Sequence, residues 1–336
     1  MAEFDAAAFR RLQPDAARVL ENAFSLHRLS HAYLFEGPIG TKKEDAALWF
    51  AKRLLCSAEA DLRPCLVCKN CRNVGQKQHP NLFWVEPEGD FVKKDQMRRI
   101  LAEFSRTALI DLPRVVIIRD AHRMNAESAN TMLKFIEEPT AEAYFILITD
   151  QIDAMIKTLL SRSQVLHFKP IDRHLVEAEL KTSGVNDRMA ILIAQYTADL
   201  DAAKAIAADQ AMMEVLDLAV TLFVKALARK ESLILLFQSK RDLVFSSPER
   251  IDFFLTVLTV IQKDIVGLKR HKSGIAVDTV DAELTGALAR RTSSEAALAL
   301  LDRMLETKAR LRFNVNQSLQ FDNLILHLER GYSHGI

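Results

Sequence analysis

The sequence is poor in glycine and proline, and it contains no tract of biased composition and no repeat of fixed length. Only ten Gly and nine Pro are spread over 336 residues, which excludes collagen-like and low-complexity chains. No apolar run reaches the roughly 18 residues that a membrane-spanning helix needs. The start, MAEFDAAAFRRL, lacks the charged-then-apolar order of a signal peptide. We therefore expect a globular, cytoplasmic protein that does not contact a membrane.

The chain also has almost no net charge, with a formal value of +1. Lys and Arg total 45 against 44 Asp and Glu, so the composition does not support a dominant electrostatic role in DNA binding and favours proteins as direct partners. A chain of 336 residues is too long for one ordinary hydrophobic core. Two or three domains are therefore expected.

Cysteine is absent except from one short stretch. Cys56, Cys65, Cys68 and Cys71 form a C-x8-C-x2-C-x2-C array. Two overlapping C-x2-C steps bring three thiolates within reach of one metal ion, and the fourth, at the end of the preceding helical segment, completes a tetrahedral Zn²⁺ site. Because a reducing cytoplasm disfavours disulfides, structural zinc is favoured over a redox or free-thiol role. Four ligands leave no open position for water, so this zinc would organise structure rather than catalyse.

Residues 31–44, HAYLFEGPIGTKKE, read as a strand, a glycine-bearing turn and the start of a helix. This is the geometry of a phosphate-binding loop, G-x-x-x-x-G-K-[ST]. Gly37 and Lys43 fit the pattern, but Lys42 stands at the second glycine and Glu44 at the hydroxyl that holds magnesium. A Lys side chain restricts the backbone there, and the carboxylate adds negative charge where polyphosphate would lie. We therefore expect this chain neither to bind nor to hydrolyse ATP.

Two later strands end in polar residues at positions that matter in ATPases. The apolar strand 114–119 ends at Asp120, a Walker B pattern whose Asp would hold magnesium. The next residue, where an ATPase would carry a Glu to polarise the attacking water, is Ala121. At the end of the strand 144–149, Thr149 occupies a sensor position or, more simply, caps the following helix.

Two other polar features have ordinary explanations. His122 lies on a loop between a strand and a helix, where histidine more often packs or caps than acts as a base. Glu137 and Glu138 end a helical segment before Pro139, and exposed acids at a helix end are usually solvated. Neither feature is therefore expected to be catalytic.

The order of apolar patterns indicates the fold class. Strands expected at 33–36, 81–86, 114–119, 144–149 and 164–168 alternate with helices, which predicts an α/β fold with a parallel sheet covered on both faces. After residue 170 the pattern is helical throughout, with Gly184 as a break between two short helices. Long amphipathic segments follow from about residue 212, and their exposed faces offer surfaces for oligomer contacts.

Several motifs in this order carry a family likeness. They are HAYLFEGPIG, the Cys56 to Cys71 array, SANTMLKFIEEP, the Ser161-Arg162-Ser163 triplet and FNVNQSLQFDNLIL. Over nearly its whole length the chain resembles bacterial clamp-loader subunits of the AAA+ family. The resemblance implies a RecA-like AAA+ domain at 1–169 with a zinc module at about 56–71, a small helical lid at 170–208, and an all-α C-terminal collar at 209–336 that joins five subunits into a ring.

The resemblance also implies a role for Arg162. In the family's Ser-Arg-Cys motif the arginine reaches the ATP bound by the adjacent subunit; here Ser163 stands in place of Cys. An arginine supplied in trans stabilises charge on the transferring phosphoryl group and is worth roughly 10³ to 10⁵ in rate. Taken alone, an Arg in a loop is most often a surface charge.

The leading hypothesis is a non-hydrolysing clamp-loader subunit, a stator that supplies Arg162 to its neighbour. Its implied partners are the delta and gamma/tau subunits in a hetero-pentamer, and through that complex the sliding clamp and primed DNA. One alternative is an ATP-hydrolysing motor subunit, gamma/tau-like, or another AAA+ ATPase. A second alternative is a zinc-stabilised scaffold unrelated to replication.

Overall fold

The computed structural model describes residues 6–59, 62–104, 112–137, 142–270, 281–311 and 316–333. The chain divides into two compact units, Met1–Ile171 and Asp172–Ile336. This division falls close to the expected end of the α/β domain, whereas the separate lid at 170–208 and collar at 209–336 stay predictions. Within the described ranges, no helix combines the length and the apolar character that crossing a bilayer requires.

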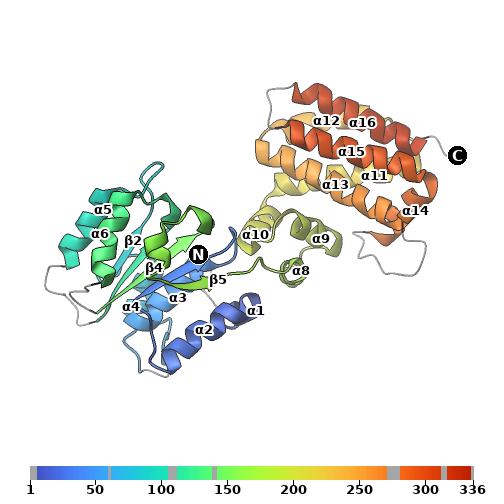
Figure 1. The fold of residues 1–336 in the computed structure, drawn as a ribbon. Helices are drawn as coiled ribbons and strands as arrows, with labels where there is room; N and C mark the ends of the chain where they lie inside the picture. The colour runs from blue at the N-terminus through green and yellow to red at the C-terminus, as the bar shows by residue number, and fades with distance from the viewer. Residues whose placement is uncertain are drawn as a thin grey trace. The chain divides into compact units, whose positions relative to one another are not determined.

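The first unit is built on one parallel sheet of five strands in the order β2-β3-β4-β1-β5 (Figure 1). The strands are β1 (Ala32–Glu36), β2 (Leu82–Val85), β3 (Arg114–Ile118), β4 (Ala143–Thr149) and β5 (Gln164–His167). Strands β3 and β4 are buried along their whole length, as expected where helices cover both faces of a sheet. The predicted α/β class with a parallel sheet covered on both faces is therefore confirmed.

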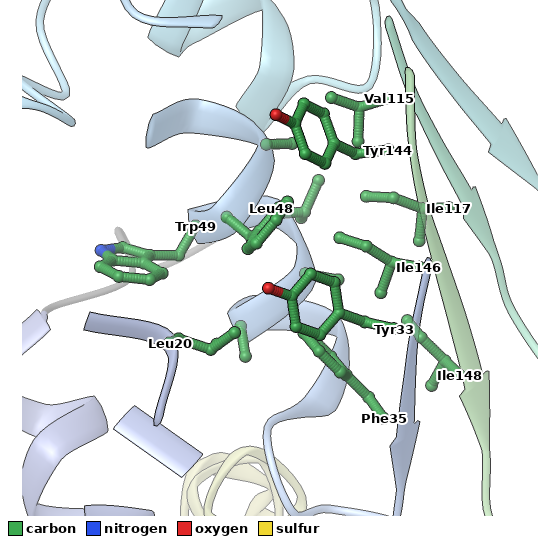
Figure 2. Close-up of a cluster of buried hydrophobic side chains, with 14 of the residues drawn as sticks. Leu20, Tyr33, Phe35, Leu48, Trp49, Val115, Ile117, Tyr144, Ile146 and Ile148 are labelled. Atoms are coloured by element: carbon green, nitrogen blue, oxygen red, sulfur yellow. The ribbon is translucent and has the colours of Figure 1, made fainter. Parts of the chain in front are cut away.

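Alternate side chains of the strands build two separate cores, since successive residues of a strand point to opposite faces. Figure 2 shows one core, in which Tyr33, Ile117 and Ile146 of the sheet are directed toward Leu20 and Leu48 of the covering helices. Helices that contribute to this core are α1 (Ala6–Leu12), α2 (Pro14–Ser25), α3 (Lys43–Leu55) and α4 (Lys69–Gly75). The opposite core receives α5 (Lys94–Phe104), α6 (Ala126–Glu137) and α7 (Lys157–Leu160).

The direction of the connections places one functional edge on the sheet. The loop after β1 leads to α3 on one face, and the segment after β4 leads to α7 on the other. In doubly wound sheets, ligands bind outside the carboxyl ends of neighbouring strands whose connections go to opposite faces. A ligand-binding site is therefore expected at the carboxyl ends of β1 and β4, which pair in parallel.

The second unit is entirely helical in the part of it that the structure describes. Its helices are α8 (Arg173–Thr182), α9 (Asp187–Tyr196), α10 (Leu200–Ala208), α11 (Gln210–Ala228), α12 (Leu233–Phe245), α13 (Pro248–Arg270), α14 (Ala282–Arg291), α15 (Ser294–Arg310) and α16 (Gln317–Ser333). Asp or Asn side chains cap the starts of α8, α9, α10, α11 and α14 by accepting backbone N–H bonds.

The long helix α13 forms the centre of this unit and packs against α11, α14 and α15. One buried polar chain ties three helices together. Tyr332 Oη of α16 donates to Gln262 Oε1 at 2.7 Å, and Gln262 Nε2 donates to the Ala297 carbonyl at 2.8 Å. Buried polar groups that are satisfied in this way hold a core in one arrangement.

Differences from the expected elements are confined to short segments and element ends. The seven-residue helices α1 and α4 had no counterpart in the sequence analysis. The segment between β4 and β5 forms the short 3₁₀ helix η3 (Ile152–Ala154) and then α7 from Lys157. The expected acid Glu138 and helix stop Pro139 lie outside the described residues.

Candidate functional site

The loop between β1 and α3 is held in place by its first glycine. Gly37 donates its N–H to the Thr149 carbonyl at 3.2 Å, so the loop is tied to the end of β4. A Cβ added at Gly37, whose φ is +149°, would lie 2.2 Å from the Phe168 carbonyl oxygen. Glycine is therefore required here by a close approach of two backbone segments.

Lys43, the loop lysine of the phosphate-binding pattern, folds back onto its own loop. Its ammonium donates to the carbonyls of Gly37 and Pro38, the latter at 2.6 Å, and to Thr41 Oγ1 at 3.3 Å. The residue is only 8% exposed. Burial lowers the pKa of Lys43, although the carboxylate of Asp150 opposes that shift. The ammonium is thus bound by the same loop that would wrap a phosphate.

Lys42 takes the backbone shape that the pattern assigns to glycine. Its φ of +67° and ψ of 23° are left-handed, and it caps the N-terminus of α3 without a side-chain hydrogen bond. Its ammonium lies 3.3 Å from Asp45 Oδ2. The left-handed region is unfavourable for residues with a Cβ, so the loop keeps a glycine-like turn at this position in spite of the lysine.

Glu44, at the hydroxyl position of the pattern, faces an arginine. Arg119, which directly follows β3, lies 3.3 Å from Glu44, 3.5 Å from Glu86 and 3.6 Å from Asp120. All four side chains are partly exposed, so each pair alone stabilises the fold only weakly. Together they fill the region beside the loop with protein charges of both signs.

The residues after β3 and β4 meet at the same edge. Ala121 is buried and offers only a methyl group. His122 Nδ1 lies 3.0 Å from Thr149 Oγ1 and 3.5 Å from Asp150 Oδ1, and the Gln151 N–H donates to the Thr149 hydroxyl at 3.0 Å. The Thr149 hydroxyl thus accepts from the backbone two residues further on, in a local turn. The N-terminal cap of the following 3₁₀ helix is Gln151, so Thr149 does not cap that helix.

We refer to seven residues at this edge as the edge cluster: Lys43, Glu44, Arg119, Asp120, His122, Thr149 and Asp150. Possible ligand atoms of Asp120, His122 and Asp150 lie within 4.8 Å of one another. Lys43 interacts electrostatically with Asp120 and Asp150, so its ammonium already balances part of the negative charge of these two carboxylates. The contact between His122 and Thr149 was not predicted from the sequence. The available signal was that both residues lie at or just after the carboxyl ends of neighbouring parallel strands.

The four cysteines, which we call the cysteine cluster, converge as the spacing predicts. Their sulfurs all lie within 4.8 Å of one another, with Cys56 Sγ 3.5 Å from Cys65 Sγ and 3.9 Å from Cys68 Sγ. Four thiolates about 2.3 Å from a tetrahedral Zn²⁺ would be roughly 3.8 Å apart. The arrangement therefore fits one zinc ion, and the thiols are free rather than disulfide-bonded.

Backbone N–H groups around the cysteine cluster are directed toward two of its sulfurs. The N–H groups of Ala58 and Cys65 point to Cys56 Sγ, and that of Cys71 to Cys68 Sγ, at 3.4 to 3.5 Å. Burial opposes ionisation of Cys68, but hydrogen bonds from Ser57 and Cys71 outweigh it and lower the pKa of this thiol to about 5. Burial raises the pKa of the Cys71 thiol.

Two helix ends position the cysteines. Cys56 directly follows α3, and Cys68 is the N-terminal cap of α4. Asn70 Nδ2 donates to the Leu55 carbonyl at 2.9 Å and so satisfies an open carbonyl at the end of α3. A metal bound here would link the C-terminal end of α3 to the N-terminal end of α4.

Arg162 follows α7 and makes its contacts with α6 and with its own turn. Its Nε–H donates to Glu137 Oε1 at 2.5 Å, and Nη1 lies 3.4 Å from the Thr158 carbonyl and 3.5 Å from Ser161 Oγ. The side chain is 42% exposed. The hydroxyl of Ser163, in contrast, is buried without a partner among the described residues, which is a poor position for a polar group.

Comparison with known proteins gives matches over most of the chain. A family model described as DNA polymerase III, delta subunit, matches residues 12–172. The chain is 32% identical over 322 residues to DNA polymerase III subunit delta′ of Bacillus subtilis, covering 95% of this chain and 97% of that protein. It is 35% identical to subunit delta′ of Pseudomonas aeruginosa over 40% of this chain and 41% of that one. It is also 31% identical to subunit tau of Salmonella typhimurium, over half of this chain and 26% of tau.

Proposed function

Because this chain belongs to the delta′ family of DNA polymerase III subunits, we propose that it is a non-hydrolysing stator of the bacterial clamp loader. It joins the delta and gamma/tau subunits in a hetero-pentamer and supports ATP-dependent loading of the sliding clamp onto primed DNA. Its own ATP site is inactive. Its Arg162 acts on the ATP held by the neighbouring subunit.

The closure of the loop on Lys43 carries the non-hydrolysing part of this proposal. A polyphosphate would have to draw the ammonium away from the carbonyls of Gly37 and Pro38. Hydrogen bonds to a charged group are worth about 1.5 to 3 kcal/mol each, so losing them lowers nucleotide affinity by a factor of roughly ten or more per bond. The methyl group of Ala121 has no means of polarising a water molecule.

The exposed guanidinium of Arg162 supports the role in trans. Both of its recorded side-chain partners, Glu137 and Ser161, are themselves on the surface, so the group is accessible to a second protein. Arg162→Ala is expected to leave folding intact and to lower the clamp-stimulated ATPase activity of the reconstituted loader. Unchanged turnover would exclude the finger role. Arg98→Ala, which removes another exposed arginine paired with a nearby acid, is the matched control.

Zinc is proposed to stabilise the module between α3 and β2. Cys56, Cys65, Cys68 and Cys71 would hold the ion, whose four closed coordination positions supply structural rather than Lewis-acid chemistry. The asparagine contact between α4 and the end of α3 would reinforce the same junction. The module therefore has no direct part in the ATP reaction.

A nucleotide-binding assay on the isolated chain tests the inactive site. Titration with a fluorescent ATP analogue and magnesium is expected to show no micromolar binding, and no phosphate release should be detected. The double variant Lys42→Gly/Glu44→Thr rebuilds the complete loop pattern and is expected to bind nucleotide more tightly, still without turnover because Ala121 is unchanged. Micromolar affinity with hydrolysis by the unmodified chain would instead support a gamma/tau-like motor.

A further inference from the structure

Glu137 lies at an unusual place for an acid. It lies in the last described turn of α6, two residues before Pro139, and open carbonyls near a helix C-terminus give that region a partial negative charge. Helix C-termini favour Lys, Arg and His, so a carboxylate here goes against the local preference. Local rules are broken most often where a residue has a function. The sequence predicts a solvated Glu137, and its side chain is 47% exposed, but it also has a partner.

That partner is the guanidinium of Arg162, and the contact uses one particular edge. The Nε–H of Arg162 donates to Glu137 Oε1 at 2.5 Å. Nη1 lies near the Thr158 carbonyl and the Ser161 hydroxyl. A guanidinium carries five N–H donors in a rigid plane, and no acceptor from the described residues is within hydrogen-bond distance of Nη2. Glu137 therefore occupies the edge that carries Nε–H, and Thr158 and Ser161 occupy the opposite edge at Nη1. The N–H of Nη2 at the far end of the group is left for a further acceptor.

We propose that Glu137 is a positioning residue that fixes the plane of Arg162 and leaves Nη2 for a phosphoryl oxygen of the nucleotide bound by the adjacent subunit. The inference rests on the proposed finger role of Arg162. A free arginine side chain samples many rotamers, and ordering it during the reaction costs entropy. A carboxylate that already holds Nε removes part of that freedom, and correct placement of reacting groups can change a rate by large factors.

The charge of Glu137 has an opposing effect that is smaller. A carboxylate beside the guanidinium reduces the net positive charge that approaching phosphate meets. Both side chains are more than two-fifths exposed, so water and salt screen this repulsion. The orientation given by the hydrogen bond is not screened in the same way. Glu137 therefore acts mainly by orientation and only weakly by charge.

The test uses the reconstituted loader with clamp and primed DNA, and it measures kcat and KM for ATP. Glu137→Ala is expected to lower kcat about tenfold with little change in KM, because ATP is bound by the neighbour and Glu137 acts on the reaction alone. Glu137→Gln keeps an acceptor oxygen for Nε and is expected to recover most of the rate. Glu127→Ala, which removes another exposed acid on α6 paired with Lys94 at 3.0 Å, should have no effect.

The double variant Glu137→Ala/Arg162→Ala separates the two proposals. If Glu137 acts through Arg162, the double variant is as slow as Arg162→Ala alone. Unchanged or faster turnover of Glu137→Ala, beside a slow Arg162→Ala, would overturn the positioning role only. If Glu137→Ala slowed turnover by the same factor in the wild-type chain and in Arg162→Ala, the positioning role would also be overturned. Normal turnover of Arg162→Ala would overturn the finger role itself. Thermal unfolding and gel filtration establish that each variant folds and assembles.

Discussion

The edge cluster and the cysteine cluster are both polar sites in the same α/β unit, but they differ in how far the chain itself satisfies them. In the edge cluster, the ammonium of Lys43 is bound by its own loop and the Glu44 carboxylate by Arg119. In the cysteine cluster, four free thiols face one another. The chain itself satisfies these charges of the edge cluster, whereas the cysteine cluster has a geometry that a metal would complete.

The two clusters differ because a metal site depends on side-chain atoms and a phosphate loop on backbone shape. A metal site depends on side-chain atoms, so losing one ligand destroys it. A phosphate loop depends largely on backbone shape, and that shape persists at Gly37 and Lys42 although the side chains have changed. The proposed loss of nucleotide chemistry would therefore leave the fold of the edge cluster intact, whereas loss of a cysteine ligand would destroy the metal site.

Removal of the metal is expected to have the largest effect. Structural Zn²⁺ contributes an apparent binding free energy of about 10 kcal/mol or more at neutral pH in small zinc domains, so its loss should unfold the module around α4 and lower the melting temperature. Metal analysis is expected to find one zinc per chain and much less in Cys68→Ser. Val67→Ser, an exposed neighbour, should keep the metal. Freshly purified protein without zinc would contradict the site.

An added methyl group at Gly37 is expected to have the next largest effect. The Cβ of Gly37→Ala would lie 2.2 Å from the Phe168 carbonyl, and relieving such an overlap costs about 3 kcal/mol. Chemical denaturation measures the loss.

Gly89→Ala is the matched control for the change at Gly37. Gly89 has a φ of +76°, but a Cβ added there meets nothing within 4 Å. This variant should lose only about 1 kcal/mol, from backbone strain. Equal losses at the two glycines would mean that the close approach at Gly37 has little energetic weight.

The sequence predicted the sheet and the cysteine cluster well for identifiable reasons. Strands covered on both faces are continuous apolar runs, and YFILIT of β4 is buried at every position. The cysteine spacing restricts the thiols to one neighbourhood regardless of the surrounding fold. In both cases the signal is local in the sequence, so tertiary structure was not needed to read it.

The pairing of Glu137 with Arg162 could not be read in the same way. The residues are 25 positions apart, and their contact depends on where α6 ends relative to the turn after α7. The meeting of His122 with Thr149 likewise depends on the pairing of β3 with β4. Helix α4 was missed because its seven residues include a cysteine and a glycine and show little apolar periodicity.

The smallest expected effect concerns Lys42, and it tests whether the edge cluster keeps a glycine-shaped turn at an energetic cost. Lys42→Gly should relieve the strain of the left-handed backbone at φ +67° and stabilise the fold by about 1 kcal/mol, less the loss of the contact with Asp45 and the added freedom of the unfolded chain. Lys42→Ala loses the same contact but keeps the strain, so the difference in unfolding free energy between the two variants is the backbone strain less the added freedom that glycine gives the unfolded chain. If alanine is more stable than glycine by the roughly 0.4 to 1 kcal/mol that the unfolded chain alone predicts, the turn is not strained, and the lysine has no cost that a function or a compensating contact must explain.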